Sequence, residues 1–229
     1  TLSIGVIGLG AMGKGMASSL RRAGHHVSVC DVRFDAAEAF AQEGGTAYKT
    51  PADLAKQVDI IVSVVVNADQ TEQVLFGEHG AAAHLKAGSL FIMCSTVDPN
   101  WSVTLEKRLN DLGLLYLDAP ISGGAAKAAS GQMTMMTSGQ AAAYAKAGNA
   151  LESMAANVYK LGDRAGYGSK VKIINQLLAG VHIAAAAEAM ALGLREGVAA
   201  DALYEVITNS AGNSWMFENR MAHVLKGDY

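Results

Sequence analysis

The chain has 229 residues, of which 51% are hydrophobic and 17% charged, enough apolar content for a packed core and too much for a wholly disordered protein. At about 100–200 residues per domain, this length predicts one large domain, or one domain and part of a second. The formal net charge of −3 gives no general electrostatic basis for binding nucleic acid or an anionic membrane. The two cysteines, Cys30 and Cys94, are too few for a disulfide framework, so we expect reduced, buried thiols in a cytoplasmic protein.

The first 162 residues alternate short β-branched runs with amphipathic helical patterns, which is typical of βαβ units and a parallel sheet. The run 59–66 is continuously apolar, as expected for a central strand that is buried on both faces. Strands are expected at 2–7, 27–30, 59–66, 90–94, 114–117 and 133–137, and helices at 11–23, 35–42, 70–76, 100–112 and 141–154.

After residue 162 the strand patterns stop, and three helices are expected, at 169–197, 201–210 and 214–226. The first would be about 40 Å long. It is apolar almost all round, so we expect it to be buried on most sides, with His182 a hydrogen-bonded core residue. Its polar residues, His182 and Glu188 among them, would be costly in lipid and argue against a membrane span. The sequence thus predicts an α/β chain, with a doubly wound domain (1–162) followed by an all-α domain (163–229).

A glycine pattern follows the first expected strand, in the order Gly8-Leu9-Gly10-Ala11-Met12-Gly13. Alone, G-x-G-x-x-G is also compatible with a plain turn. Here it lies between a strand and a helix, where the three glycines would allow a tight turn, close approach to a pyrophosphate, and helix–strand packing. The amide groups at the helix start would hold the pyrophosphate. This predicts a Rossmann domain that binds a dinucleotide.

Asp31 ends the second expected strand, 21 residues after Gly10, as expected for the residue that binds the adenosine ribose. A carboxylate accepts hydrogen bonds from both ribose hydroxyls and repels a 2′-phosphate, so we expect NAD rather than NADP. Arg33 favours the opposite choice, NADP, because it would attract that phosphate. Val66 and Asn67, which follow another strand, are weaker candidates for the cofactor site.

Lys172 stands out in the long helix, because Asn175 and Gln176 lie three and four residues later on the same face. Desolvation would lower the pKa of such a lysine toward a range useful for proton transfer. The alternative is that Lys172 only extends to the surface. Lys170 has apolar residues at the corresponding positions, so we expect it to be solvated.

Two strand ends carry hydroxyl groups and glycines. Ser122-Gly123-Gly124 offers a hydroxyl and free amides for a substrate carboxylate, although an ordinary turn would look the same. Ser95 and Thr96 precede Asp98-Pro99, so their hydroxyls cap a helix, line the cofactor site, or do both. The histidines show no metal-ligand spacing, so no metal is expected, and Met133, Met135 and Met136 are interpreted as strand core.

Four segments together resemble the β-hydroxyacid dehydrogenases related to 3-hydroxyisobutyrate dehydrogenase. They are IGLGAMGKGM at 7–16, STVDP at 95–99, DAPISGG at 118–124 and GYGSKVKIINQ at 166–176. The resemblance implies that Lys172 is the general acid/base and that Asn175 orients the substrate and the lysine. It also implies that Ser122, Gly123 and Gly124 anchor the substrate carboxylate and that Thr96 contacts the nicotinamide end of NAD. Gln176 is placed at the substrate, in a position where many relatives have a second Asn, and Ser19 also replaces a frequent Asn.

The implied activity is NAD-dependent oxidation of a small hydroxy acid. Over the run 172–198 and SAGNSWMFEN at 210–219, the sequence most resembles family members that oxidise L-threonate to 2-oxo-tetronate, so the resemblance ranks L-threonate as the first candidate substrate. Reduction of tartronate semialdehyde or succinate semialdehyde, oxidation of 3-hydroxyisobutyrate, and a non-enzymatic NAD-binding sensor remain as alternatives.

The resemblance also bears on how the helical domain is covered. Relatives continue past position 229 into further helices that help to close the active site. We therefore expect a partial helical domain with slow turnover, or cover from a partner subunit in a homodimer or homotetramer, with no nucleic acid or membrane partner.

Overall fold

The computed structural model describes residues 1–228. It contains two compact units, Thr1–Lys172 and Ile173–Tyr229. The first unit carries both sheets, and the second is helical.

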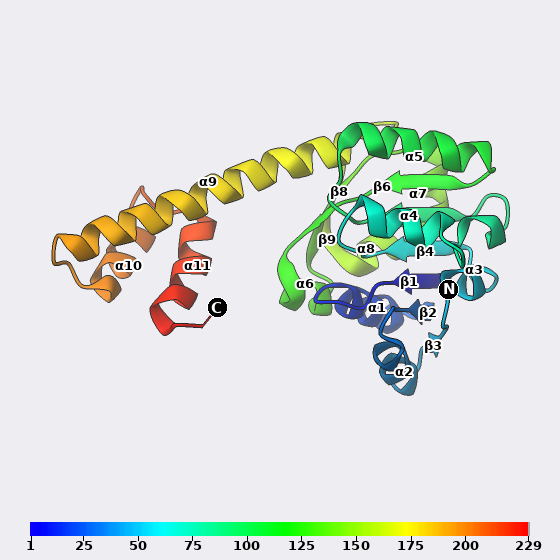
Figure 1. Cartoon of the computed structure of the whole chain (residues 1–229), viewed down its shortest axis with the longest axis horizontal. Helices are drawn as coiled ribbons and strands as arrows, with labels where there is room; N and C mark the ends of the chain where they lie inside the picture. The colour runs from blue at the N-terminus through cyan, green and yellow to red at the C-terminus, as the bar shows by residue number, and fades with distance from the viewer. Residues whose placement is uncertain (229) are drawn as a thin grey trace. The chain divides into compact units, whose positions relative to one another are not determined.

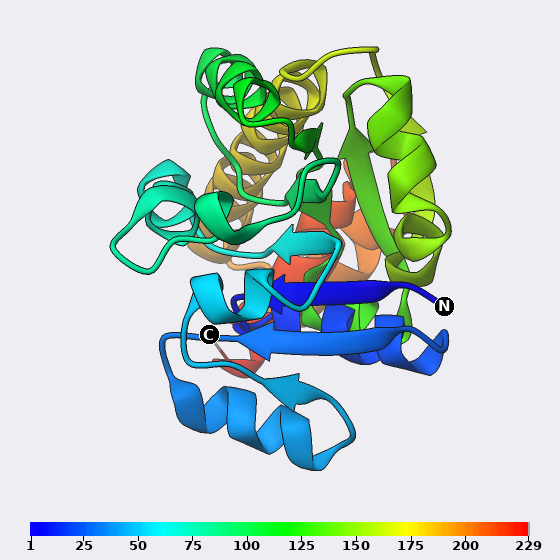
Figure 2. The ribbon, with the colours of Figure 1, turned by 90° about the vertical axis from the view of Figure 1, so that its right-hand side faces the viewer.

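The main sheet has six parallel strands in the order β3-β2-β1-β4-β5-β6 (Figure 2). The order runs outward in both directions from β1 and β4, which is the doubly wound arrangement predicted from the sequence. Ile7, the last residue of β1, pairs with Cys30 on one side and with Ser63 on the other, so these strand ends share one edge. The strands are β1 Ser3–Ile7, β2 His26–Cys30, β3 Thr46–Ala47, β4 Ile60–Ser63, β5 Leu90–Met93 and β6 Leu115–Asp118.

Helices cover both faces of this sheet (Figure 1). Alternate strand residues point to opposite sides, so Val62 belongs to one hydrophobic cluster with Leu20 of the first helix, and Ile61 to the other with Leu75. Both Cys30 and Cys94 are buried, as predicted. The helices between these strands are α1 Gly13–Arg22, α2 Phe34–Gln42, α3 Pro51–Ala55, α4 Ala68–Phe76 and α5 Pro99–Asp111, with a short 3₁₀ turn at Ala82–His84.

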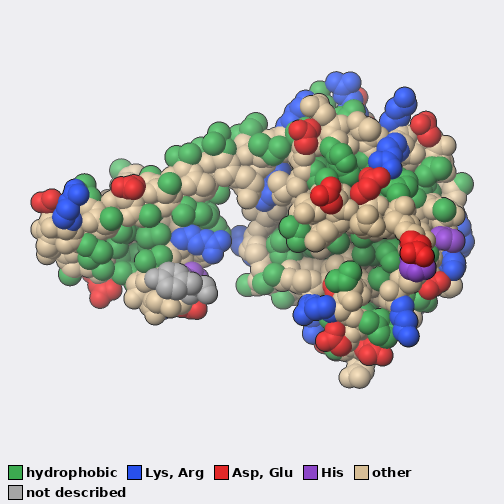
Figure 3. Space-filling view, viewed as in Figure 1, with side chains coloured by type: hydrophobic (Ala, Val, Ile, Leu, Met, Phe, Trp, Pro, Cys, Tyr) green, Lys and Arg blue, Asp and Glu red, His purple; other side chains and the backbone are tan. Residues whose placement is uncertain are grey.

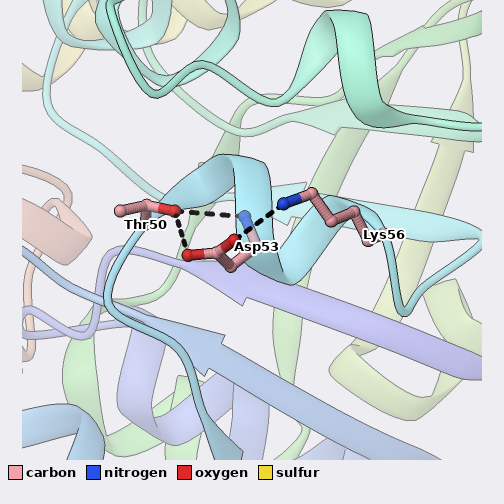
Figure 4. Close-up of polar contacts among 3 residues, drawn as sticks. All are labelled: Thr50, Asp53 and Lys56. Atoms are coloured by element: carbon pink, nitrogen blue, oxygen red, sulfur yellow. Dashed lines mark hydrogen bonds and ion pairs between the residues drawn. The ribbon is translucent and has the colours of Figure 1, made fainter.

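Helix α3 was not predicted, although its start has a capping sequence (Figure 4). The Thr50 hydroxyl accepts a 3.1 Å hydrogen bond from the Asp53 amide and donates one of 2.8 Å to its carboxylate. Pro51 opens the helix, where its missing amide hydrogen costs nothing. Hydrogen bonds from Lys56 and Thr50 lower the pKa of Asp53. This short helix fixes the chain just after Lys49, at the wall of the cavity described below.

A second sheet follows β6, with β8 pairing antiparallel to β7 and parallel to β9. The strand predicted at 133–137 is present, and Met133, Met135 and Met136 are buried in it, as predicted. The single helix predicted at 141–154 is wrong, because Gly148 has a left-handed φ of 54° and breaks the run into two. The elements are β7 Ile121–Ser122, α6 Gly124–Ser130, β8 Met133–Thr137, α7 Ala141–Ala147, α8 Ala150–Met154 and β9 Ala155–Lys160.

The last three helices are α9 Tyr167–Arg195, α10 Ala200–Thr208 and α11 Trp215–Lys226. A small core joins them, in which Ala186 and Met190 of α9 pack with Phe217 and Met221 of α11. By length and composition α9 could cross a membrane, with a mean hydropathy of 1.7 over its most apolar window, but core helices of soluble proteins pass the same test.

The prediction that α9 is buried on most sides is wrong for the part of the chain that the structure describes, residues 1–228. Leu177 and Val181 are 66% and 54% exposed, and Figure 3 shows hydrophobic side chains along this helix at the surface. His182 is also exposed rather than in a core. The reason is that the hydrophobic cover within the described chain reaches α9 mainly around Ala186 and Met190.

Candidate active site

The glycine turn between β1 and α1 uses its three glycines differently. Gly8 has a φ of 93°, and a Cβ there would collide with the Val64 carbonyl oxygen. A Cβ on Gly13 would collide with the carbonyl oxygen of Gly8. A Cβ on Gly10 would meet nothing within 4 Å. The protein's own packing therefore requires Gly8 and Gly13, whereas the open space at Gly10 is what a bound pyrophosphate would need.

Asp31 follows β2 at the edge of this turn. Its Oδ2 accepts a 2.6 Å hydrogen bond from the Leu9 amide, and its Oδ1 accepts one of 2.8 Å from the Arg33 amide. The Arg33 guanidinium is 4.0 Å from Oδ1 and largely exposed. The carboxylate is thus fixed beside the glycine turn, with further lone pairs available to a ligand.

A cavity of about 650 Å³ opens beside the glycine turn and Asp31. Its walls include Val64, Val65 and Val66, so the strand predicted at 59–66 is wrong at its end: β4 stops at Ser63. The last three residues of that apolar run leave the sheet and face the cavity. Val32 is fully exposed and Val66 is 75% exposed, which are unusual environments for apolar side chains and suit a planar apolar group of a ligand. The size, the open glycine and the carboxylate together fit a dinucleotide.

Other predicted cofactor residues have local roles in the structure. Leu9, Ala11 and Met12 form the glycine turn itself, and Asn67 caps α4 by accepting a 2.9 Å hydrogen bond from the Gln70 amide. The Ser95 hydroxyl donates a 2.7 Å hydrogen bond to the Val65 carbonyl, which ties the loop after β5 to the cavity wall. Asp98, rather than Ser95 or Thr96, caps α5. Thr96 is exposed in the same loop.

Lys172 lies in the second turn of α9 and is 7% exposed. Burial lowers the pKa of its ammonium group, as predicted for a lysine on an apolar helix. Lys170 is exposed, with its Nζ 5.1 Å from the centre of the Tyr167 ring, so the two lysines have the different environments that the sequence predicted. Asn175 and Gln176 follow one turn later, with the Asn175 Nδ2 3.5 Å from the Gln176 Oε1.

Ser122, Gly123 and Gly124 form the junction of β7 and α6. Gly123 and Gly124 have φ values of 139° and 76°, which only glycine adopts readily. The far end of α6 is fixed to α1, because the Ser19 hydroxyl donates a 2.9 Å hydrogen bond to the Ala128 carbonyl. This contact gives Ser19 a structural role.

Comparison with known proteins agrees with this geometry. Residues 3–162 match the family described as the NAD binding domain of 6-phosphogluconate dehydrogenase. Residues 166–229 match the family described as "NAD-binding of NADP-dependent 3-hydroxyisobutyrate dehydrogenase". The L-threonate dehydrogenase of Cupriavidus necator is 63% identical over 99% of this chain and 76% of that protein. The L-threonate dehydrogenase of Escherichia coli K12 is 48% identical over 99% of this chain and 75% of that protein.

The chain belongs to the β-hydroxyacid dehydrogenase family. It is an NAD-dependent dehydrogenase that acts on a small hydroxy acid. A crystal structure from Salmonella typhimurium named 3-hydroxyisobutyrate dehydrogenase matches this dehydrogenase with a TM-score of 0.94 and 48% identity, over 100% of this chain and 80% of that one. The predictions of family, fold class, reaction type and cofactor are therefore confirmed.

Two buried carboxylates in this dehydrogenase were not assigned from the sequence. Glu106 of α5 accepts hydrogen bonds of 3.2 and 3.1 Å from the Ala165 amide, and burial raises its pKa. Asp118, at the end of β6, is fully buried and accepts hydrogen bonds from the start of α9. The sequence offered one indication for Asp118, because it is a charged residue directly after an expected buried strand. Within residues 1–228, no three His, Cys, Asp or Glu side chains gather as a metal site.

Proposed function

We propose that this dehydrogenase oxidises L-threonate to 2-oxo-tetronate, with Lys172 as the general acid/base. The substrate proposal rests on the 63% identity to the L-threonate dehydrogenase of Cupriavidus necator. The proposed role of Lys172 rests on its burial near the start of α9, which favours the neutral amine.

The chemistry needs two transfers from the hydroxyl-bearing carbon. Bound NAD supplies the hydride acceptor for the hydrogen on carbon. Neutral Lys172 accepts the hydroxyl proton at Nζ, and the carbon–oxygen single bond becomes a carbonyl. In the reverse direction the protonated lysine returns that proton. We propose that Asn175 orients the substrate and the lysine, with Gln176 also at the substrate.

The remaining site residues bind rather than react. Ser122, Gly123 and Gly124 are proposed to hold the substrate carboxylate through a hydroxyl and free amides. Gly8 to Gly13 hold the pyrophosphate at the start of α1, Val66 and Asn67 line the path of the cofactor, and Thr96 contacts its nicotinamide end. Asp31 binds the adenosine ribose.

We propose that NAD is preferred to NADP, because the Asp31 carboxylate would repel a 2′-phosphate. Two cations oppose this preference: Arg33 and Lys49 both line the cavity. The ratio of the KM values for NAD and NADP shows whether the repulsion by Asp31 or the attraction by the two cations is stronger. A lower KM for NADP would show that the cations outweigh Asp31.

The substrate is tested by following NADH formation with L-threonate, D-glycerate, 3-hydroxyisobutyrate and 4-hydroxybutyrate. We expect L-threonate to give the highest kcat/KM. The reverse reaction is followed with tartronate semialdehyde and succinate semialdehyde. A higher kcat/KM for either aldehyde, or for 3-hydroxyisobutyrate, would replace the proposed substrate.

We further propose a cytoplasmic protein in which residues 1–162 form the cofactor domain and 163–229 the substrate and oligomerisation domain. The exposed apolar side chains of α9, such as Ile174 and Leu177, support a homodimer or homotetramer formed through this region. Light scattering after size-exclusion chromatography measures the mass in solution, and a monomer would contradict this part of the proposal.

A further inference from the structure

Helix α9 has no capping side chain at the position directly before its first residue. The residue before it is Gly166, which has a φ of 99°. The first amide groups of a helix have no partner within the helix and must find one elsewhere. In this chain the partners come from other elements, because the Gly166 and Ser169 amides donate hydrogen bonds of 2.9 Å each to Oδ2 of Asp118.

Asp118 is fully buried, and each of its carboxylate oxygens has a partner. Ser169 adds a 2.7 Å hydrogen bond from its hydroxyl to Oδ1. The Ser138 hydroxyl donates to Oδ2 at 3.2 Å and accepts a 2.9 Å hydrogen bond from the Gly168 amide. A buried carboxylate is costly unless its oxygens are satisfied, and the positive end of a helix dipole offsets part of that cost.

The start of α9 lies close to β6 and β8, and this makes its hydrogen bonds to Asp118 possible. A Cβ on Gly168 would collide with the Met136 carbonyl oxygen and lie 3.0 Å from the carbonyl oxygen of Asp118. Glycine at this position therefore allows the helix start to lie directly against β6 and β8. The Gly-Tyr-Gly-Ser run at 166–169 is explained by this packing, since its glycines bring the Ser169 amide within reach of Asp118.

The contact joins the two halves of the proposed active site. On one side, Asp118 is followed directly in the chain by residues 119–124, which end in the Ser-Gly-Gly segment proposed to hold the substrate carboxylate. On the other side, Ser169 lies three residues before Lys172, so the two share one face of α9.

We propose that Asp118 is a positioning residue that caps α9 from β6 and thereby fixes Lys172 relative to the substrate-anchoring segment. This inference rests on the proposed function of Lys172. Asp118 is hydrogen-bonded to Gly166 and Ser169, so it acts on Lys172 through the position of the helix start. A displacement of about 1 Å in such a site can reduce the rate by about 10²-fold.

The test compares Asp118→Ala and Asp118→Asn with Glu106→Gln in the full chain. Glu106 is a matched control, because it is a buried carboxylate that holds the same loop at Ala165 but has no hydrogen bond to α9. We expect Asp118→Ala to lower kcat by about 10²-fold with an unchanged Kd for NAD. Asp118→Asn keeps an oxygen acceptor and should restore most of kcat, and Glu106→Gln should leave kcat unchanged.

A readout that does not depend on activity is hydrogen–deuterium exchange over residues 166–172. Asp118→Ala should speed exchange there, whereas Glu106→Gln should not. If Asp118→Ala does not fold, Ser169→Ala serves in its place, because it removes one hydrogen bond to Oδ1 and should lower kcat by about 2–10-fold.

The positioning role is overturned by any of three results. The first is a wild-type kcat in Asp118→Ala or, where that variant is unfolded, in Ser169→Ala. The second is unchanged exchange over 166–172. The third is an equal loss of kcat in Glu106→Gln, which would indicate a general structural effect. Lys172→Met separates this inference from the proposed function: if that variant retains turnover, the role of Lys172 fails; if it is inactive while Asp118→Ala is fully active, only the positioning role fails.

Discussion

The Leu9 amide donates a 2.6 Å hydrogen bond to Oδ2 of Asp31, so the residue expected to bind the ribose also holds the glycine turn. Leu9 is the second residue of the glycine pattern, between Gly8 and the open position at Gly10. If the glycine turn binds the pyrophosphate and Asp31 binds the ribose, as proposed, these two parts of the cofactor site are coupled through one side chain.

This coupling predicts that Asp31→Ala weakens cofactor binding more than the loss of a ribose contact alone. Hydrogen bonds to charged groups contribute about 1.5–3 kcal/mol, so the Kd for NAD should rise at least about 10-fold. Asp31→Asn keeps one oxygen acceptor and should have an intermediate Kd. NADH fluorescence titration measures both values, and an unchanged Kd in Asp31→Ala would contradict the coupling.

The two glycines Gly10 and Gly13 make a matched pair for substitution by alanine. Gly10→Ala should fold normally, because its Cβ would point into open space, but it should bind NAD poorly. Gly13→Ala should lower the free energy of unfolding by about 1–3 kcal/mol, because its Cβ meets the Gly8 carbonyl oxygen.

Thermal unfolding and NAD titration of both variants give the readouts. Wild-type affinity in Gly10→Ala would show that the pyrophosphate does not approach this position. Wild-type stability in Gly13→Ala would show that the helix and strand can separate at little cost.

Glu106 predicts a dependence of stability on pH. Burial raises its pKa in the folded protein, so the folded state favours the protonated acid. Its contribution to stability is therefore fully present below its ordinary pKa of 4.5 and is lost as the pH rises through the raised value. Glu106→Gln should thus be at least as stable as the wild type at pH 7, and the difference should disappear below pH 4.5.

Glu106→Ala is the contrasting variant. It leaves the Ala165 amide without its acceptor and should cost about 1–3 kcal/mol. Chemical denaturation at several pH values measures both variants. A Glu106→Gln protein that is less stable than the wild type at neutral pH would contradict the sign of this effect.

The sequence predicted the parallel sheet and the glycine turn well, because both depend on local patterns. Apolar runs identify buried strands, and the distance from Gly10 to Asp31 reflects one βαβ unit. The helix that carries Lys172, Asn175 and Gln176 was also predictable, because the run 169–197 is rich in Ala and Leu and has no Pro.

Features that depend on tertiary pairing were missed. Strand β9 has the sequence AANVYK, with weak alternation, and it forms because β8 lies beside it. The break between α7 and α8 depends on the left-handed φ of Gly148, and a single glycine in a helical pattern does not predict such a φ. The partners of Asp118 lie 48 and 51 residues away in the chain, beyond any local pattern.

The prediction that α9 is buried on most sides failed for a different reason. An apolar pattern shows that a surface is suited to burial, but it does not identify what covers it. Val181 and His182 are exposed in the described chain, whereas Met190 meets the core with α11.

The role of Lys172 carries the proposed chemistry, and Lys172→Met tests it most directly. The variant should fold, because burial lowers the pKa of Lys172 and so the charged form costs stability below its ordinary pKa of 10.5. The variant should therefore match or exceed the wild type in thermal stability at pH 7. The decisive measurement is kcat for NADH formation from L-threonate, with the Kd for NAD as control. We predict that kcat falls by about 10²–10⁴-fold while the Kd stays within about twofold. A folded Lys172→Met protein that retains wild-type kcat would contradict the account.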